Sequence, residues 1–383
     1  MKLYNSLSKK ITDFTPLETG KVKMYVCGIT PYDTTHLGHA FTYMQFDALR
    51  RYLTFKGFQV TYTQNVTDID DDILKRAKRD GKDWQELGQY WTERFVSDLK
   101  ALHIQMPDNY VKATDYIDKI VEIVRLLIEK KQAYEKNGNV YFDVSTFPKY
   151  GDLSGFSEDQ MKYISSERGA DPNDPNKKNP LDFVLWTSST EDQPGWESPW
   201  GRGRPGWHIE CSAMAASTLG DQLDIHGGGR DLVFPHHESE IAQSESFTGK
   251  TPYVQTWMHT AMLMYQGEKM SKSLGNMLFA TDLLKKYSSD TIRWVLLSHH
   301  YRTPWEFQDE MADEAAQMIK QIQLLNQSET FDQKTLDELC QFVENDLKIS
   351  DALNKISQSL PNASTSEQAA IRKFLSILGF TFN

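Results

Sequence analysis

The sequence has few cysteines, no excess of basic charge and no long apolar run. Among its 383 residues only Cys27, Cys211 and Cys340 are cysteines. This odd and widely spaced set argues against a disulfide framework and favours reduced thiols that are free to bind metal. The chain carries 42 Lys and Arg against 53 Asp and Glu, a formal charge of −11, which excludes a protein that coats nucleic acid nonspecifically.

Membrane and secretory segments are also missing. No apolar stretch approaches the roughly 20 residues of a membrane span, and the opening residues MKLYNS lack the apolar core of a secretory signal. With 39% hydrophobic and 12% aromatic residues, the composition is typical of a globular protein. We therefore expect a cytoplasmic monomer with about two or three domains.

The hydrophobic pattern predicts an α/β fold. Apolar runs at Lys23–Cys27 and Gln59–Tyr62 flank a helical pattern from about residue 39 to 55, which is the order of a βαβ unit in a parallel sheet. Amphipathic patterns from about 85 to 135 predict helices that cover this sheet. Two further strands are expected, at Leu223–His226 and Val254–His259.

Two segments depart from this pattern. Residues from about 136 to 205 are dense in Pro and Gly, which predicts a loop-rich insertion, and helical patterns dominate from about 308 onward. We expect a catalytic domain of residues 1–305 that carries the insertion, followed by a short helical domain of residues 306–383. The latter holds thirteen acidic and six basic side chains, a net charge of −7.

The segment TPYDTTHLGH, Thr30–His39, is a candidate phosphate site between the first strand and the first helix. Phosphates bind where a helix N-terminus exposes unpaired N–H groups at the carboxyl edge of a parallel sheet. His36 and His39 add donors for the charge that builds in a transition state. Taken alone, the segment is also typical of a solvated turn with a capping histidine.

A second motif, KMSKS, occupies Lys269–Ser273 and is followed closely by Gly275. Lysines 269 and 272 on a mobile loop suit a triphosphate whose pyrophosphate departs. A solvated turn is the alternative interpretation of this loop when it is considered by itself.

The third candidate is a set of metal-binding side chains. Cys27 ends the first strand, Cys211 lies in the sequence WHIEC, and His236 and Glu240 are four residues apart, so that a helix would place both on one face. Two thiolates, an imidazole and a carboxylate suit zinc. Spacing alone leaves open that the cysteines are buried structural residues.

Together these motifs resemble the cysteinyl-tRNA synthetase superfamily of class I adenylate-forming enzymes. His36–His39 stands at the position of the HIGH motif, Lys269–Ser273 matches the KMSKS signature, and two long segments match closely, Gly206–Ser212 and Asp224–Glu238. The resemblance implies a Rossmann-like class I (HUP) catalytic domain. It further implies that the protein uses ATP with Mg²⁺ to convert L-cysteine into cysteinyl-AMP and pyrophosphate.

The resemblance also implies roles for single residues. It assigns catalysis to His36, His39, Lys269 and Lys272. It assigns one zinc ion to Cys27, Cys211, His236 and, as a variable fourth ligand, Glu240. Contacts to the substrate or the adenylate are expected at Cys27, Gly28, Ile29, Thr30, Thr42, Asn65, Val66, Thr67, Trp207, Gly229, Arg230, Asp231 and Leu263.

The acceptor of the activated cysteine is predicted from finer features. Pro31, His39 and the sequence ERGADP at Glu167–Pro172 are closest to the mycothiol-pathway ligase of this superfamily, which joins cysteine to glucosaminyl-inositol. The acidic helical region also disfavours tRNA, whereas Glu240 is synthetase-like. We expect an amine acceptor of the glucosaminyl-inositol type; the alternatives are a cysteinyl-tRNA synthetase with a truncated C-terminus and a non-catalytic regulatory paralogue.

Other conspicuous residues have simpler explanations. The carboxylates of Asp68–Asp72 are compatible with Mg²⁺, but capping and charging of a helix N-terminus is the favoured interpretation. Cys340 lies in an apolar helical pattern and is expected in a core. His226 and His237 are expected to orient the metal ligands.

Overall fold

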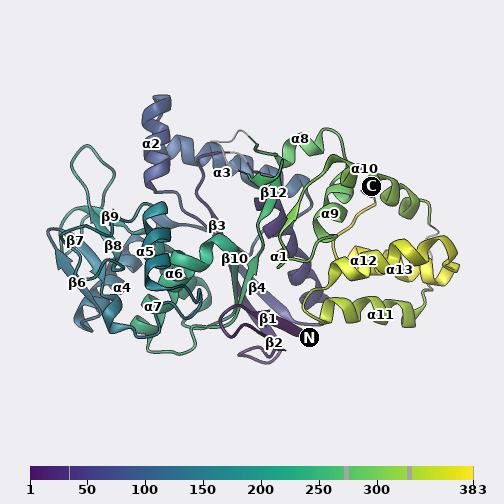
Figure 1. Cartoon of the computed structure of the whole chain (residues 1–383), viewed down its shortest axis with the longest axis horizontal. Helices are drawn as coiled ribbons and strands as arrows, with labels where there is room; N and C mark the ends of the chain where they lie inside the picture. Colours follow the sequence, from purple (N-terminus) through teal and green to yellow (C-terminus); the bar gives the residue numbers. More distant parts are fainter. Residues whose placement is uncertain (34, 271–275, 326–329, 383) are drawn as a thin grey trace.

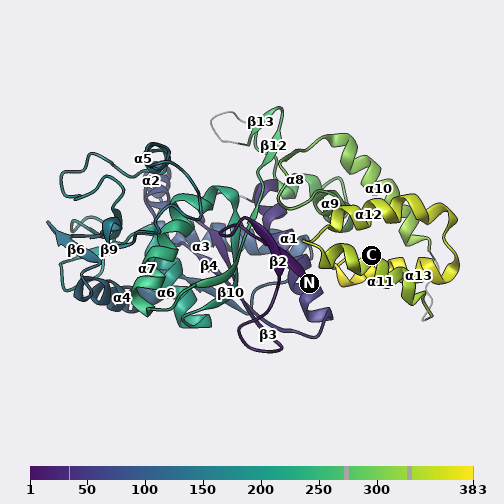
Figure 2. The same cartoon turned by 60° about the horizontal axis from the view of Figure 1, so that its bottom comes forward.

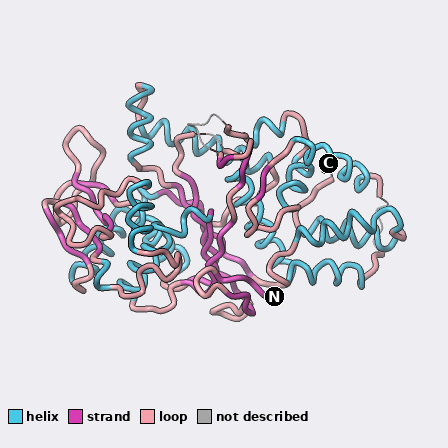
Figure 3. Tube along the Cα trace, viewed as in Figure 1, coloured by secondary structure: helices cyan, strands magenta, loops and turns pink. Residues whose placement is uncertain are grey.

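The protein, studied as a computed structural model, is described over residues 1–33, 35–270, 276–325 and 330–382. A five-stranded sheet stands at the centre, flanked by a lobe with its own small sheet on one side and by a helical region on the other (Figure 1). The strands gather in the centre and in that lobe, while the opposite side is helical (Figure 3). The predicted α/β fold is thereby confirmed.

The central sheet is parallel throughout and has the strand order β11–β10–β3–β4–β5. In that order the strands span Val254–Thr260, Leu223–Gly229, Lys21–Ile29, Gln59–Val66 and Asn109–Lys112. The chain runs outward from β3 to β5 and then returns to β10 beside β3. The switch point between β3 and β10 is where open α/β sheets bind ligands, at the carboxyl ends of the strands.

The helices between these strands only partly follow the sequence prediction. Helices α1 (Leu37–Phe55), α2 (Asp71–Asp80) and α3 (Trp84–Ala101) precede β5, so the helices expected from about 85 to 135 are interrupted by a strand at Asn109–Lys112, which was not predicted. Four residues are too few to show a strand period between two strong helical patterns. Helix α4 (Ile117–Glu129) also differs, because it packs against α6 and β6 of the lateral lobe.

The lateral lobe contains the segment predicted as an insertion. It is more regular than expected, with an antiparallel sheet of order β6–β7–β8–β9 and its own apolar core around Ile120, Val140 and Trp186. The strands span Ala133–Lys136, Asn139–Phe142, Phe183–Ser188 and Gly203–Pro205, and α5 spans Glu158–Glu167. Helices α6 (Trp207–Leu219) and α7 (Glu238–Thr248) join this lobe to the central sheet.

The remaining elements lie at the ends of the chain. The N-terminus forms a hairpin of β1 (Lys2–Asn5) and β2 (Lys10–Asp13), which the sequence did not predict. After β11 the chain forms β12 (Leu263–Tyr265), β13 (Glu268–Lys269), α8 (Ala280–Leu284), α9 (Ser289–Leu297) and β14 (Trp305–Glu306). The β12–β13 hairpin projects from the body (Figure 2).

The expected helical region is confirmed and shares a core with the central domain. It comprises α10 (Asp309–Gln323), α11 (Gln333–Glu344), α12 (Ile349–Ser359) and α13 (Thr365–Ile377). One apolar cluster runs from Leu3 through Phe41 and Trp294 to Phe374. The boundary at residue 305 stays a prediction, and none of the helices in the described ranges has the length and apolarity to cross a bilayer.

A buried aspartate ties the two ends of the chain together. Asp346 Oδ1 accepts hydrogen bonds from the Tyr4 backbone N–H at 2.8 Å and the Tyr301 hydroxyl at 2.7 Å. Its Oδ2 accepts from Arg302 Nε at 3.0 Å. The aspartate therefore joins the first strand to the segment after α9 and to the helical region.

Strands β3 and β4 approach so closely at Gly28 that a side chain does not fit. A Cβ atom built on Gly28 would lie 1.6 Å from the Asn65 carbonyl oxygen. Gly28→Ala is therefore expected to lower the free energy of unfolding by at least about 2 kcal/mol. Urea-induced unfolding followed by tryptophan fluorescence measures this loss.

Gly88→Ala is the control for this prediction. A Cβ at Gly88, inside helix α3, would have its nearest neighbours at 3.9 and 4.0 Å, so helix propensity predicts a gain of up to about 1 kcal/mol. Equal stability of the two variants would contradict the close approach.

Candidate active site

The candidate site lies at the carboxyl ends of β3, β4 and β10, at the switch point of the central sheet. Strand β3 contributes Cys27, β4 ends at Val66, and helix α6 brings Trp207 and Cys211 to the same edge. His236 comes from the turn that precedes α7, and Glu240 from the first turn of α7. Strands β3 and β4 are far in sequence from the continuous run of α6, β10 and α7, and the parallel sheet brings the two parts together.

The predicted metal-binding side chains form one buried cluster. Cys27 Sγ lies 4.0 Å from Cys211 Sγ and 3.7 Å from Glu240 Oε1. Glu240 Oε1 lies 3.1 Å from His236 Nε2. A group of possible donors whose ligand atoms all lie within 4.8 Å of one another consists of Cys27, His236, His237 and Glu240. It includes His237, which was not predicted as a ligand, and leaves out Cys211.

The two cysteines of the cluster differ in how readily their thiols ionise. Burial raises the pKa of the Cys27 thiol well above its ordinary value. For Cys211 burial acts in the same direction, but the hydrogen bond from Cys27 and the charge of His236 outweigh it and lower the pKa to about 7. Cys211 is therefore the thiol that ionises near neutral pH, while burial raises the pKa of Glu240.

These side chains fit a zinc ion. Donors at roughly 2.0–2.3 Å from a tetrahedral zinc are separated from one another by roughly 3.3–3.8 Å, close to the separations of 3.1, 3.7 and 4.0 Å found here. Glu240 Oε2 is buried and has no hydrogen-bond partner among the described residues, a costly state that a cation relieves. Zinc binding by Cys27, Cys211, His236 and Glu240 stays a prediction.

Further histidines contact the cluster, since His237 Nε2 lies 3.2 Å and His226 Nε2 lies 3.6 Å from Cys27 Sγ. His237 Nδ1 lies 2.7 Å from His259 Nε2, and His259 Nδ1 lies 2.8 Å from the Ser6 hydroxyl. His226 stacks on Trp257 with ring centroids 4.5 Å apart. That His226 and His237 orient the metal ligands stays a prediction. Sequence reasoning missed His259 and Ser6 because neither lies in a recognised motif.

The predicted phosphate site is at the N-terminus of α1. His36 caps this helix by accepting from the His39 backbone N–H at 3.3 Å, and the two imidazole rings stack with centroids 3.7 Å apart. The first turn of α1 carries no acidic residue, so the helix dipole is available to an anion. The capping role and the phosphate role of His36 are thus compatible.

The other predicted contact residues surround the same edge. Asn65, Val66 and Thr67 end β4, and Gly229, Arg230 and Asp231 follow β10, where Asp231 pairs with Arg168 at 3.1 Å. Thr42 meets Thr260 with hydroxyl oxygens 2.7 Å apart. Gly28, Ile29 and Thr30 end β3, and Leu263 is buried in β12. The backbone of Lys269 lies in β13, and Lys272 lies outside the described residues.

The simpler interpretations of other residues hold. Asp70 is the N-cap of α2 and accepts from the Asp72 backbone N–H at 2.7 Å, while Asp68 accepts from Thr114. Cys340 is buried in the apolar cluster of the helical region. These residues therefore do not extend the candidate site.

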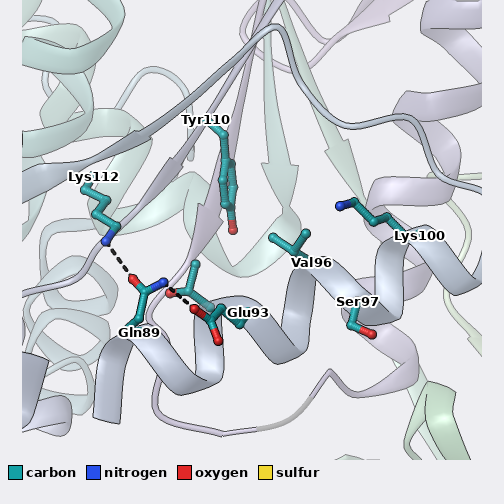
Figure 4. A pocket seen from close by; sticks show the side chains of 8 residues that line it. Gln89, Glu93, Val96, Ser97, Lys100, Tyr110 and Lys112 are labelled. Carbon is teal, nitrogen blue, oxygen red and sulfur yellow. Dashed lines mark hydrogen bonds between the residues drawn. The ribbon is translucent and has the colours of Figure 1, made fainter. Parts of the chain in front are cut away.

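A separate cavity of about 530 Å³ lies between helix α3 and the edge strand β5 (Figure 4). Lys112 donates to Gln89 at 2.8 Å across its rim, and the Tyr110 ring points into it. Its lining residues are Gln89, Thr92, Glu93, Val96, Ser97, Lys100, Tyr110 and Lys112. None of the predicted site residues contributes to this cavity.

A parallel sheet with its candidate site at the switch point, beside a helix N-terminus without acidic residues, is typical of nucleotide-binding α/β proteins. Comparison with known proteins agrees with this class of fold and identifies the family within it. The family model described as the tRNA synthetases class I (C) catalytic domain matches residues 13–317. The chain belongs to this family.

Individual relatives support the assignment. The chain is 50% identical over 311 residues to a cysteine–tRNA ligase of Pyrococcus furiosus, covering 81% of this chain but only 64% of that enzyme. It is 46% identical to a cysteine–tRNA ligase of Dehalococcoides mccartyi over 93% of this chain and 79% of that enzyme. The fold matches a methionyl-tRNA synthetase of Mycobacterium tuberculosis solved with methionyl-adenylate, with a TM-score of 0.68 at 17% identity, over 94% of this chain and 89% of that one.

Proposed function

We propose that this protein activates L-cysteine with ATP and Mg²⁺ to form cysteinyl-AMP, and transfers the cysteinyl group to tRNA. The buried cluster of Cys27, Cys211, His236 and Glu240 carries the proposal, because its sulfur, nitrogen and oxygen donors converge beside the phosphate site. The names of the relatives support cysteine as substrate. They favour tRNA over the glucosaminyl-inositol amine that the motifs predicted.

In this proposal the residues at the two ends of the site have different roles, one end binding the thiol and the other the phosphates. Cys27, Cys211, His236 and Glu240 would hold zinc, which when bound supplies a preference for a thiolate over the hydroxyl of serine. His36 and His39 donate to phosphate oxygens at the N-terminus of α1. By resemblance Lys269 and Lys272 act on the departing pyrophosphate, and the ends of β3, β4 and β10 hold the adenylate.

Pyrophosphate exchange tests the activation step. The purified protein is expected to exchange pyrophosphate into ATP in the presence of cysteine, and at least about 1,000-fold less efficiently with serine, because serine cannot supply a thiolate. An absence of cysteine-dependent exchange would contradict the proposal.

A second assay identifies the acceptor. Labelled cysteine, ATP and Mg²⁺ are incubated with total tRNA or with glucosaminyl-inositol, and the label is expected on tRNA. Label on the sugar amine instead would restore the acceptor predicted from Pro31 and the ERGADP segment, and would leave the activation step untouched.

A further inference from the structure

Helix α2 and the turn after it carry a dense group of basic side chains in an acidic protein. The chain as a whole has a formal charge of −11, but the eight residues Lys75–Lys82 hold five basic side chains and one acidic side chain, a net charge of +4. A local reversal of charge of this kind is typical of a surface that binds an anionic partner.

The basic side chains lie on the exposed face of α2. Ile73 and Ala77 bury the opposite face against α3. Lys75, Lys78 and Arg79 share the outer face, since they are spaced i, i+3 and i+4. The side chains of Lys75 and Arg79 are 75% and 64% exposed. The helix also extends beyond the elements around it, at the top of the view in Figure 1, so this face is accessible to a large partner.

The requirements of the helix itself explain only part of this charge. Lys78 and Arg79 lie in the last turn of α2, where cations offset the helix dipole. Lys75 lies in the first half of the helix, and Lys82 lies beyond its C-cap. These two lysines therefore do not serve the helix end.

Carboxylates on the same helix neutralise three of the basic groups. Asp80 pairs with Arg76 at 2.5 Å and with Arg79 at 2.8 Å. Lys75 Nζ lies 3.7 Å from Asp72 Oδ1. Exposed pairs of this kind are weak, so a partner with several negative charges can compete with them.

The two remaining lysines have no such neighbour. Lys78 and Lys82 form no ion pair with any of the described residues. Asp192 acts on Lys78 only at longer range, and Lys82 Nζ lies 6.0 Å from the centre of the Tyr90 ring. Lys78 and Lys82 thus present ammonium groups that can bind phosphate directly.

Helix α2 begins beside the candidate active site. Four residues separate it from the end of β4. Asp71 pairs with Arg204 of the lateral lobe, and Arg76 Nη1 lies 3.9 Å from Asp33 Oδ2 in the candidate phosphate segment. With ten residues the helix is about 15 Å long, and it leads outward from the edge of the sheet where the predicted site residues gather.

One of the proposed substrates is large enough to reach along α2. Cysteine and ATP are small and bind at the edge of the sheet, whereas a tRNA whose 3′ end enters the site places the preceding nucleotides outside it. The phosphates of those nucleotides carry the negative charge that the outer face of α2 complements.

We propose that the outer face of α2, with Lys78 and Lys82 as its unpaired cations, binds the phosphate backbone of the acceptor tRNA. This inference rests on the proposed function, since it takes tRNA as the acceptor. Contacts to phosphates position the RNA and increase its affinity without reading its base sequence.

A Lys78→Gln/Lys82→Gln double variant tests the inference, because glutamine at these exposed positions removes the charge but keeps much of the side chain. The dissociation constant of a fluorescently labelled cysteine-accepting tRNA is expected to rise about 10-fold, and the slope of log affinity against log salt to fall by about two. Fluorescence anisotropy at several salt concentrations measures both. Unchanged affinity, or a loss without a change in slope, would overturn the inference and leave an acidic protein as the partner that α2 fits.

Two activities of the same variant separate RNA binding from cysteine activation. Pyrophosphate exchange needs no tRNA and is expected to stay within about twofold, whereas KM for tRNA in the transfer reaction rises about 10-fold at a kcat within about twofold. An equal loss of exchange would show that the lysines act on the activation step, and would overturn the inference.

Lys21→Gln/Lys250→Gln is the control variant. Lys21 begins β3 and Lys250 precedes β11, so both exposed lysines lie at the amino ends of the strands, on the opposite edge of the central sheet. The variant loses the same number of charges as the test variant. Its affinity for tRNA and its salt slope are expected to be unchanged.

The inference and the proposed function can fail separately. A protein that transfers no cysteine to tRNA would refute the proposed function. Transfer by the unmodified protein, combined with an unchanged KM for tRNA in the Lys78→Gln/Lys82→Gln variant, would refute only the role of α2.

Discussion

Cys211→Ala is expected to lower the efficiency of cysteine-dependent pyrophosphate exchange by on the order of 1,000-fold or more and to remove zinc from the purified protein. Cys211 is the thiol that ionises most readily in the cluster, with a pKa of about 7, and its loss leaves Cys27 as the sole sulfur donor there. Elemental analysis and the exchange assay measure the two effects.

Cys340→Ala separates this effect from the general loss of a buried thiol. Cys340 is buried among apolar residues of the helical region, so its substitution leaves zinc content unchanged and exchange within about twofold. If zinc-free Cys211→Ala protein exchanged pyrophosphate as well as Cys340→Ala, the cluster would have no role in activation.

Arg293→Met is expected to reduce the free energy of unfolding by about 3–5 kcal/mol. The Arg293 side chain is fully buried and binds Asp47 Oδ2 at 2.7 Å, the Leu378 carbonyl at 2.8 Å and the His103 carbonyl at 2.9 Å. Methionine fills a similar volume but removes the buried positive charge beside Asp47 and leaves three carbonyl groups, those of Leu102, His103 and Leu378, without this donor. Urea-induced unfolding measures the loss.

An exposed arginine serves as the comparison. Arg125 forms a single pair with Glu129 at 2.8 Å on the surface of α4, with both side chains 54% exposed. Arg125→Ala is expected to change the free energy of unfolding by no more than about 0.5 kcal/mol. Similar losses in the two variants would show that the buried network contributes no net stability.

The central strands could be predicted from sequence because each combines an apolar run with a turn at its end. Strand β5 could not, since its four residues, NYVK, lie between two longer helical patterns. The strands of the lateral lobe were hidden for a related reason: they are short and separated by Pro- and Gly-rich turns, and only pairing with one another reveals them. Short strands depend on tertiary contacts rather than on local pattern.

The candidate site, too, could be predicted only in part from local sequence patterns. The sulfur, imidazole and carboxylate donors of the cluster belong to motifs and were found in the sequence, while His259 and Ser6, which lie in no motif, were not. His259 contacts the cluster through His237, with their ring nitrogens 2.7 Å apart, and no local pattern records such a pairing between distant residues. The sequence motifs also predicted an acceptor that the relatives do not favour.

The bonds around Asp346 make the N-terminal hairpin depend on the helical region. The Tyr4 N–H and the Lys2 carbonyl have their partners at Asp346, so the contacts of β1 are complete only when the helical region is in place. Such distant pairing delays folding.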